Sequence, residues 1–271
     1  MRTLRRSIHE PCDKIVIYQM GKVGSTSIQF SLESRKLEIP VFHIHYLNPV
    51  NMRRIEKIYR KNWSKGERPA HLWQSEYLNR RKDTGLTGEK WKVISLVRDP
   101  VSRNVSSFFQ VLYLQENYHY LKNIGQRSLD EVTDDVIRLF FDQFPDHDIP
   151  LQWFDTEMMQ VLGVDVYRHV FPKDKGYVVI PGAKWDIMLI RLESLNNCAS
   201  DAFKDFLGLD GFSVVDSNVG ESKDYADLYN AFKKKLCFPE EYLEKMYSSK
   251  MVKHFYTEDE IAIFKNKWKQ C

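Results

Sequence analysis

A short glycine-containing loop at residues 19–27 carries side chains suited to holding a phosphate-like anion. It reads Gln-Met-Gly-Lys-Val-Gly-Ser-Thr-Ser and follows an apolar, β-branched run at residues 14–18. Gly21 and Gly24 let the backbone approach an anion, and Lys22 adds a compact positive charge. A helix is expected to start directly after these glycines. Its first residues, Ser25, Thr26 and Ser27, supply hydroxyl and N–H groups at a helix end where negative charge is favoured. The loop predicts an anion site, with a plain strand-to-helix turn as the alternative.

A second anion-binding pattern follows the apolar run at residues 91–97. Arg98 leaves this expected strand, and Asp99-Pro100 supplies a helix N-cap with proline at the first helical position. Ser106 comes about two helical turns later, so both side chains can point into one crevice. Arginine offers a phosphate dianion two parallel hydrogen bonds, and serine adds a hydroxyl. The alternative is a capped helix in which Arg98 pairs with a carboxylate.

Two histidines in the apolar segment 40–47 are candidates for a general base. His43 and His45 are two residues apart, which puts them on one face of a strand. The near-neutral pKa of imidazole suits proton abstraction. We favour His45, nearer the strand exit, with His43 orienting it or the substrate. His71 and Glu33 are competing bases, and simple packing at a strand edge is the other interpretation.

Two widespread nucleotide-binding patterns are absent from the loop. Walker A needs G-x-x-x-x-G-K-[ST], whereas Lys22 precedes the second glycine here, and no G-x-G-x-x-G is present. A Mg²⁺/ATP-dependent kinase remains an alternative, with Asp99 as its metal ligand. A metal site on the histidines lacks a third ligand, so no metal is predicted.

The order of Lys22, Gly24, Ser25 and Thr26 after a first strand resembles the sulfotransferases that use 3′-phosphoadenosine-5′-phosphosulfate (PAPS). Residues 98–106 also contain R-[DE]-P-x-x-R-x-x-S, the form common in the carbohydrate branch of that family. The nearest likeness is to the bacterial group named for capsular polysaccharide synthesis. His43 and His45 resemble, by analogy, the H-x-H base motif of uronyl 2-O-sulfotransferases.

This resemblance implies roles for individual residues. Lys22 would contact the leaving phosphate and the bridging oxygen, while the loop from Gly24 to Ser27 would cradle the 5′-phosphosulfate. Arg98 and Ser106 would hold the 3′-phosphate. Lys223, in the polar segment 218–223, would close over the nucleotide. The small-molecule branch has an aromatic residue where Ser27 stands and a base motif that this chain lacks, so a saccharide acceptor is expected. A non-catalytic nucleotide- or glycan-binding relative is the remaining alternative.

Alternating strand and helix patterns position these residues. Strands are expected at 14–18, 40–47, 91–97, 164–167, 177–180 and 185–191, and helices at 25–36, from 100 onward, 129–144, 152–162, 194–207 and 239–269. They predict an α/β fold, P-loop-like and three-layered, with a central parallel sheet flanked by helices. No linker divides the chain, so one domain over residues 1–271 is expected.

Composition narrows the function classes. The chain has 271 residues, 43% hydrophobic, and 40 Lys plus Arg against 37 Asp plus Glu, for a net charge of +3. This balance argues against a nucleic-acid-coating protein and leaves room for a local basic pocket. No apolar run is long enough to span a membrane. The four dispersed cysteines suggest neither a zinc site nor a disulfide framework, so a cytoplasmic protein is predicted.

Overall fold

A computed structural model describes residues 14–61, 69–82, 90–114, 127–215 and 226–269. Its contacts divide the chain into two compact units, one from residues 1–98 with 152–218 and the other from residues 99–151 with 219–271. Each unit is described separately below. The expectation of a single domain stays a prediction.

The first unit is built on a five-stranded sheet in the order β2-β1-β3-β5-β4. Its strands are β1 (Lys14–Tyr18), β2 (Val41–Ile44), β3 (Trp91–Val97), β4 (Tyr177–Ile180) and β5 (Trp185–Arg191). All neighbours pair in parallel except β4, which runs antiparallel to β5. β1 and β3 are buried along their whole length, as expected for central strands covered on both faces.

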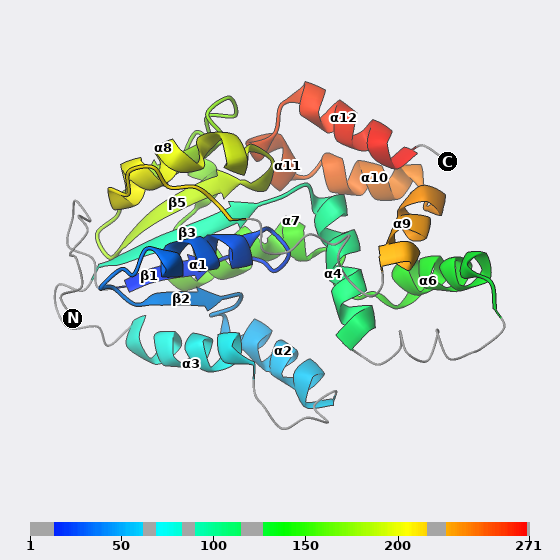
Figure 1. The fold of residues 1–271 in the computed structure, drawn as a ribbon, viewed down its shortest axis with the longest axis horizontal. Coiled ribbons are helices and arrows are strands. Elements are labelled where there is room, and N and C mark those ends of the chain that lie inside the picture. Colours follow the sequence, from blue (N-terminus) through cyan, green and yellow to red (C-terminus); the bar gives the residue numbers. More distant parts are fainter. Residues whose placement is uncertain (1–13, 62–68, 83–89, 115–126, 216–225, 270–271) are drawn as a thin grey trace. The chain divides into compact units, whose positions relative to one another are not determined.

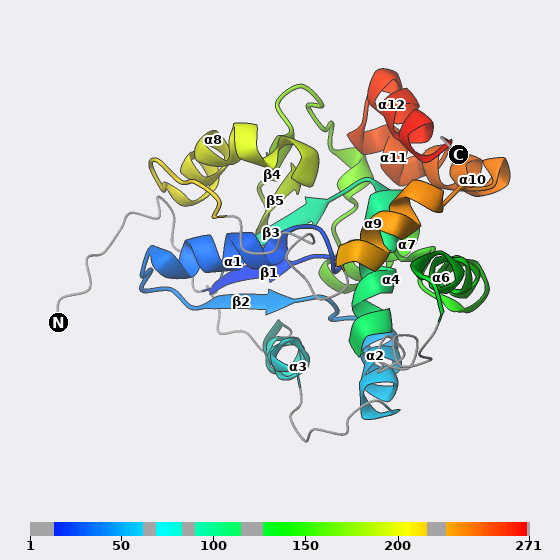
Figure 2. The ribbon, with the colours of Figure 1, turned by 45° about the vertical axis from the view of Figure 1, so that its right-hand side comes forward.

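Helices flank this sheet and complete the predicted three-layer α/β fold. Figures 1 and 2 show α1 along β1 and β2, α3 beside the edge strand β2, and α8 near β4 and β5. The helices of this unit are α1 (Ser25–Ser34), α2 (Pro49–Lys61), α3 (Ala70–Lys82), the π-helix η1 (Phe154–Leu162), the 3₁₀ turns η2 (Val166–Arg168) and η3 (Leu192–Ser194), and α8 (Leu195–Leu207). α7 (Ile149–Trp153) crosses the chain boundary between the units.

The sheet also buries an ion pair. Lys92 on β3 donates to Asp186 on β5 at 2.9 Å, and both residues are almost fully buried. Lys90 and the N–H of Gly182 also contact the Asp186 carboxylate, at 3.0 and 3.1 Å. The charge of Asp186 is therefore compensated by two cations and a backbone donor, as a buried carboxylate requires.

The second unit is helical within the described residues. Its helices are α4 (Pro100–Leu114), α6 (Leu129–Gln143), α9 (Ala226–Lys235), α10 (Glu240–Tyr247), α11 (Lys250–Phe255) and α12 (Glu258–Lys269). Phe108, Phe140 and Phe232 pack with ring centroids 5.2–5.9 Å apart and join α4, α6 and α9. These aromatic contacts form the core of the unit.

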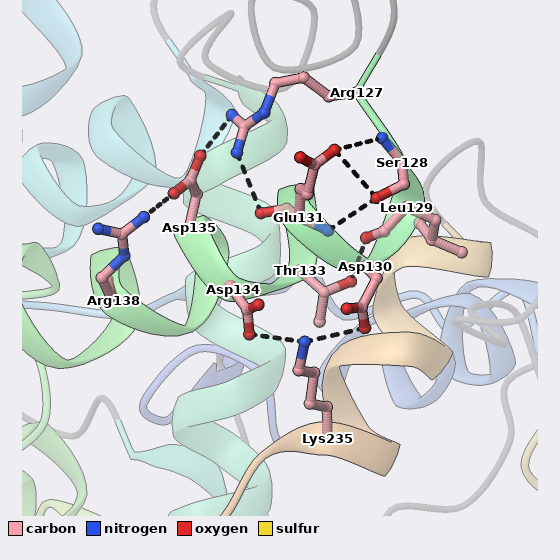
Figure 3. A network of polar contacts seen from close by, with 10 residues as sticks. All are labelled: Arg127, Ser128, Leu129, Asp130, Glu131, Thr133, Asp134, Asp135, Arg138 and Lys235. Atoms are coloured by element: carbon pink, nitrogen blue, oxygen red, sulfur yellow. Dashed lines mark hydrogen bonds and ion pairs between the residues drawn. The ribbon is translucent and has the colours of Figure 1, made fainter.

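Polar contacts complete the join between α6 and α9 (Figure 3). Lys235 bridges Asp130 and Asp134 at 2.8 and 2.7 Å, so the end of α9 is tied to the first turns of α6. Ser128 and Glu131 form a reciprocal capping box at the start of α6. The cap satisfies backbone donors that the helix itself leaves without partners.

Two local predictions are wrong. Residues 164–167 were expected as a strand, but η2 forms there because the Asp165 carboxylate accepts from the N–H of Tyr167 and starts a turn. A disulfide was not expected, yet Cys237 is disulfide-bonded, whereas Cys198 is a free, buried thiol. In the described part of the chain, no helix has the length and apolar character needed to cross a bilayer.

Candidate functional site

The loop after β1 has the backbone shape of an anion-binding turn. Lys22 has φ +74° and Gly24 has φ +85°, so two nearby residues adopt the left-handed region. Gly24 adopts this conformation without strain because it has no Cβ. A Cβ added at Gly24 would lie 2.5 Å from Leu192 Cδ1. Left-handed residues alternating with right-handed ones turn successive N–H groups toward one concavity. The loop therefore has a geometry that suits a phosphate or sulfate.

α1 begins directly after this loop, and within the described chain no side chain caps its start. Gly24 is the N-cap residue, and the first turn of the helix has no acidic residue. The predicted hydroxyl-bearing residues lie in the first turn. Ser25 is buried, whereas Thr26 and Ser27 are half-buried. The helix dipole and uncapped N–H groups favour negative charge at this position.

Arg98 lies against the same loop. It follows β3, which pairs in parallel with β1, so the ends of both strands meet at one edge of the sheet. The Arg98 Nη1 donates to the backbone carbonyl of Lys22 at 3.0 Å. The structure thus brings the guanidinium of Arg98 into hydrogen-bond contact with the backbone of the loop at residues 19–27.

Three histidine rings gather beside the loop. The rings of His43 and His45 lie 5.1 Å apart, and the ring of His71 on α3 also lies 5.1 Å from that of His45. A Cβ placed on Gly21 would be 3.9 Å from His45 Nε2, so this ring edge faces the loop. Of the three rings, only that of His45 comes within 4 Å of this position. Its role as a base stays a prediction.

Burial sets the charge state of two of these rings. Desolvation lowers the pKa of His43 to about 4, and the nearby His71 contributes to this decrease. Desolvation alone lowers the pKa of His71 to about 4. Both rings are consequently neutral at pH 7. In the residues that the structure describes, no three His, Cys, Asp or Glu side chains are arranged to hold a metal ion.

The segment that carries His45 is fixed by buried hydrogen bonds. Trp153 Nε1 donates to the carbonyl of His45 at 3.0 Å, and the Trp153 ring packs edge-on against Tyr18 at 5.0 Å. The Glu157 carboxylate accepts from the N–H groups of Leu47 and Asn48 at 2.8 and 2.9 Å and also from the Tyr18 hydroxyl. Burial raises the pKa of Glu157. These contacts hold the exit of β2 against β1.

The sequence did not identify several residues around the histidines. Gln19 lies between His43 and His45, Gln29 contacts His43, and the Gln74 side chain accepts from the His43 N–H at 2.8 Å. The register pairs Ile17 with His43, which places Gln19 level with His45. Strand alternation could have found Gln19 once this register was known, because positions 17 and 19 share a face.

Other predicted site residues belong to the second unit or lie outside the described residues. Ser106 is half-buried on α4, and its place next to Arg98 stays a prediction. Lys223 lies outside the described residues. Asp99 is buried, and its carboxylate accepts from the N–H groups of Val101 and Ser102 and from the Tyr247 hydroxyl. This capping role leaves Asp99 poorly suited as the magnesium ligand of a kinase.

Comparison with known proteins gives one match. No curated protein and no solved structure matches the chain significantly. Residues 133–257, just under half of the chain, match the model of a family described as "Putative capsular polysaccharide synthesis protein". The matched span starts within α6 and ends before α12, so it excludes the loop, the histidines and Arg98.

Proposed function

We propose that this protein transfers a sulfuryl group from PAPS to a hydroxyl of a saccharide or polysaccharide. The observation that carries the proposal is the convergence of three features at one sheet edge. These are the left-handed loop at Lys22, the Arg98 guanidinium hydrogen-bonded to it, and the His45 ring facing Gly21. The match to a capsular polysaccharide synthesis family supports a role in glycan metabolism.

The proposed reaction needs three things from the protein. The acceptor hydroxyl attacks sulfur, the new O–S bond forms, and the bond from sulfur to the bridging phosphate oxygen breaks. The products are a sulfate ester and 3′-phosphoadenosine-5′-phosphate. The protein must therefore take the hydroxyl proton, stabilise charge on the departing phosphate, and hold both partners in line.

Each need has a candidate residue. His45 Nε2 takes the proton, a step worth roughly 10²- to 10⁴-fold in rate for a well-placed base. Lys22 and the amide groups at the start of α1 stabilise the leaving phosphate. Arg98 holds the 3′-phosphate, while the roles that the resemblance implies for Ser106 and Lys223 stay expectations. No metal is required in this scheme, because fixed cations and amide dipoles supply the positive charge.

Binding of the reaction product tests the donor site. In calorimetry with 3′-phosphoadenosine-5′-phosphate, we expect the unaltered protein to bind and Arg98→Ala to bind at least tenfold more weakly. Arg35→Ala is the matched control, because Arg35 also donates to a backbone carbonyl of the first unit, that of Gly211. Equal affinity of all three proteins, or no binding by the unaltered protein, would refute the donor assignment.

Transfer itself is measured with ³⁵S-labelled PAPS and a panel of neutral and uronate-containing polysaccharides. His45→Ala should lose transfer while keeping nucleotide affinity, since the proposed base does not hold the donor. Retained transfer in His45→Ala would remove this residue as the base. Magnesium-dependent ATP turnover without any sulfuryl transfer would instead favour the kinase alternative.

A further inference from the structure

The side chain of Gln19 lies between the two histidines of the candidate site. Its Nε2 atom is 3.1 Å from His43 Nε2 and 3.3 Å from His45 Nδ1. Gln19 is fully buried, and its Oε1 atom has no hydrogen-bond partner among the described residues. A buried amide with one unsatisfied oxygen is costly, so its retention between two imidazoles calls for a reason.

A chain of hydrogen bonds orients the Gln19 amide. Gln29 Nε2 donates to the Glu33 carboxylate at 2.8 Å, which turns Gln29 Oε1 toward His43 Nδ1, also at 2.8 Å. His43 Nδ1 must then carry the hydrogen. Because burial lowers the pKa of His43 to about 4, the ring is neutral at pH 7 and its Nε2 atom is an acceptor. The Gln19 nitrogen, which can only donate, faces that acceptor.

The main chain of Gln19 sets the orientation of the second histidine. Its carbonyl oxygen lies 3.2 Å from His45 Nδ1. The His45 Nδ1 atom thus faces this carbonyl, which can only accept, and at 3.3 Å the Gln19 side-chain nitrogen, which can only donate. Because that nitrogen already donates to His43 Nε2 at 3.1 Å and the carbonyl is the nearer atom, the geometry favours the tautomer of His45 that carries its hydrogen on Nδ1. In that tautomer the lone pair is on Nε2, the atom that lies toward Gly21 of the loop. A base directed at an acceptor hydroxyl beside the loop needs this tautomer.

We propose that Gln19 is a positioning residue: its side chain fixes the ring of His43, its carbonyl fixes the tautomer of His45, and together they present His45 Nε2 to the reaction. This inference rests on the proposed sulfuryl transfer for its consequence, but its structural content stands apart from that activity. Gln19 touches neither donor nor acceptor in this scheme and acts through the two rings.

Ring nitrogen spectroscopy tests the proposal without any enzymatic assay. We would record ¹⁵N correlations of the histidine rings in the full-length protein between pH 4 and 8. The unaltered protein should show a neutral, Nδ1-protonated ring for His43 at pH 7, and the neutral form of His45 should carry its hydrogen on Nδ1. A neutral ring with its hydrogen on Nε2 at either His43 or His45 would overturn the proposal.

Substitution of Gln19 sharpens the test. Gln19→Glu places an acceptor of nearly equal shape against both rings, so His43 should gain a hydrogen on Nε2 and its pKa should rise from about 4. Gln19→Leu keeps the volume and removes the donor, so the His43 Nε2 resonance should shift. Gln74→Leu is the matched control, because Gln74 contacts the backbone N–H of His43 and not its ring.

Kinetics then separates positioning from structure. Gln19→Leu should lower kcat for sulfuryl transfer about 10- to 100-fold with the KM for PAPS unchanged, as expected when a base is misaligned. If the ring signals change on substitution of Gln19 but neither the unaltered protein nor any variant transfers a sulfuryl group, the proposed function fails and the positioning role stands. Ring signals in Gln19→Glu identical to those of the unaltered protein would overturn the positioning role.

Discussion

Gly24 is the position in the loop where a single methyl group should have the clearest effect. In Gly24→Ala, the alanine would have to adopt φ +85°, which costs an L-residue about 1–2 kcal/mol. Its Cβ would also lie 2.5 Å from Leu192 Cδ1, so the leucine must leave its rotamer at a cost of about 0.5–1.5 kcal/mol. The two terms together predict a loss of about 1.5–3.5 kcal/mol in the free energy of unfolding.

Two companion variants separate these terms. Gly163 has φ +72° with nothing within 4 Å of an added Cβ, so Gly163→Ala measures the backbone cost alone in the same unit. In a Leu192→Ala background the steric contact is removed, and Gly24→Ala should then cost no more than Gly163→Ala. The assay is urea unfolding followed by circular dichroism. Equal destabilisation by Gly24→Ala with and without Leu192 would refute the steric part of the argument, and a change under 0.5 kcal/mol would refute both parts.

Three further outcomes follow from the described contacts. His43 and His71 each have a pKa of about 4, whereas an ordinary histidine has a pKa of 6.5. Between these two pH values the folded protein therefore binds fewer protons than the unfolded chain. The free energy of unfolding should therefore fall as pH drops from 6.5 to 4, by up to about 3 kcal/mol per ring. In His71→Gln the urea midpoint should depend less on pH over this range than in the unaltered protein. The exposed control His169→Gln should show no such change. Lys92→Met removes one of the two cations that contact the buried Asp186 carboxylate and leaves Lys90 and the Gly182 N–H in place, so it should cost about 1–3 kcal/mol in urea unfolding. Part of this cost should be recovered on adding Asp186→Asn, and no recovery would contradict a charge-burial origin. Asp99→Ala removes the cap of α4 and the acceptor of Tyr247, which predicts about 2–4 kcal/mol less stability for the second unit. Trp268 fluorescence during unfolding reports this loss, and a cost no larger than that of Ser128→Ala at the exposed cap of α6 would contradict it.

The sequence predicted the sheet and the helix starts because their signals are local. The apolar runs at 14–18 and 91–97 became central strands, and Asp99-Pro100 starts α4 as the capping pattern indicates. Gly208 ends α8 with φ +66°, in agreement with the predicted stop. In each case the determining residues lie within a few positions of the element that they define.

What the sequence could not predict depends on contacts between distant residues. Nothing in the segment 152–162 signals that η1 winds as a π-helix, and the role of Glu157 appears only through its bonds to Leu47 and Asn48. Gln19 was visible as part of the loop, but its place between two histidines requires the register of β1 against β2. Polar residues of this kind acquire their roles from tertiary partners, which no local pattern encodes.

The pairing of β3 with β5 has a consequence for how the chain is made. Val97 pairs with Arg191, so β3 emerges from the ribosome long before its neighbour exists. At about 5–20 residues per second, the interval between these residues is roughly 5–20 s. During that time the edge of β3 that later pairs with β5 has no partner strand, so its backbone N–H and C=O groups can pair with other chains. Stalled nascent chains ending before Trp185 should accordingly be protease-sensitive across Trp91–Val97, and chains extended beyond Leu207 should be resistant there.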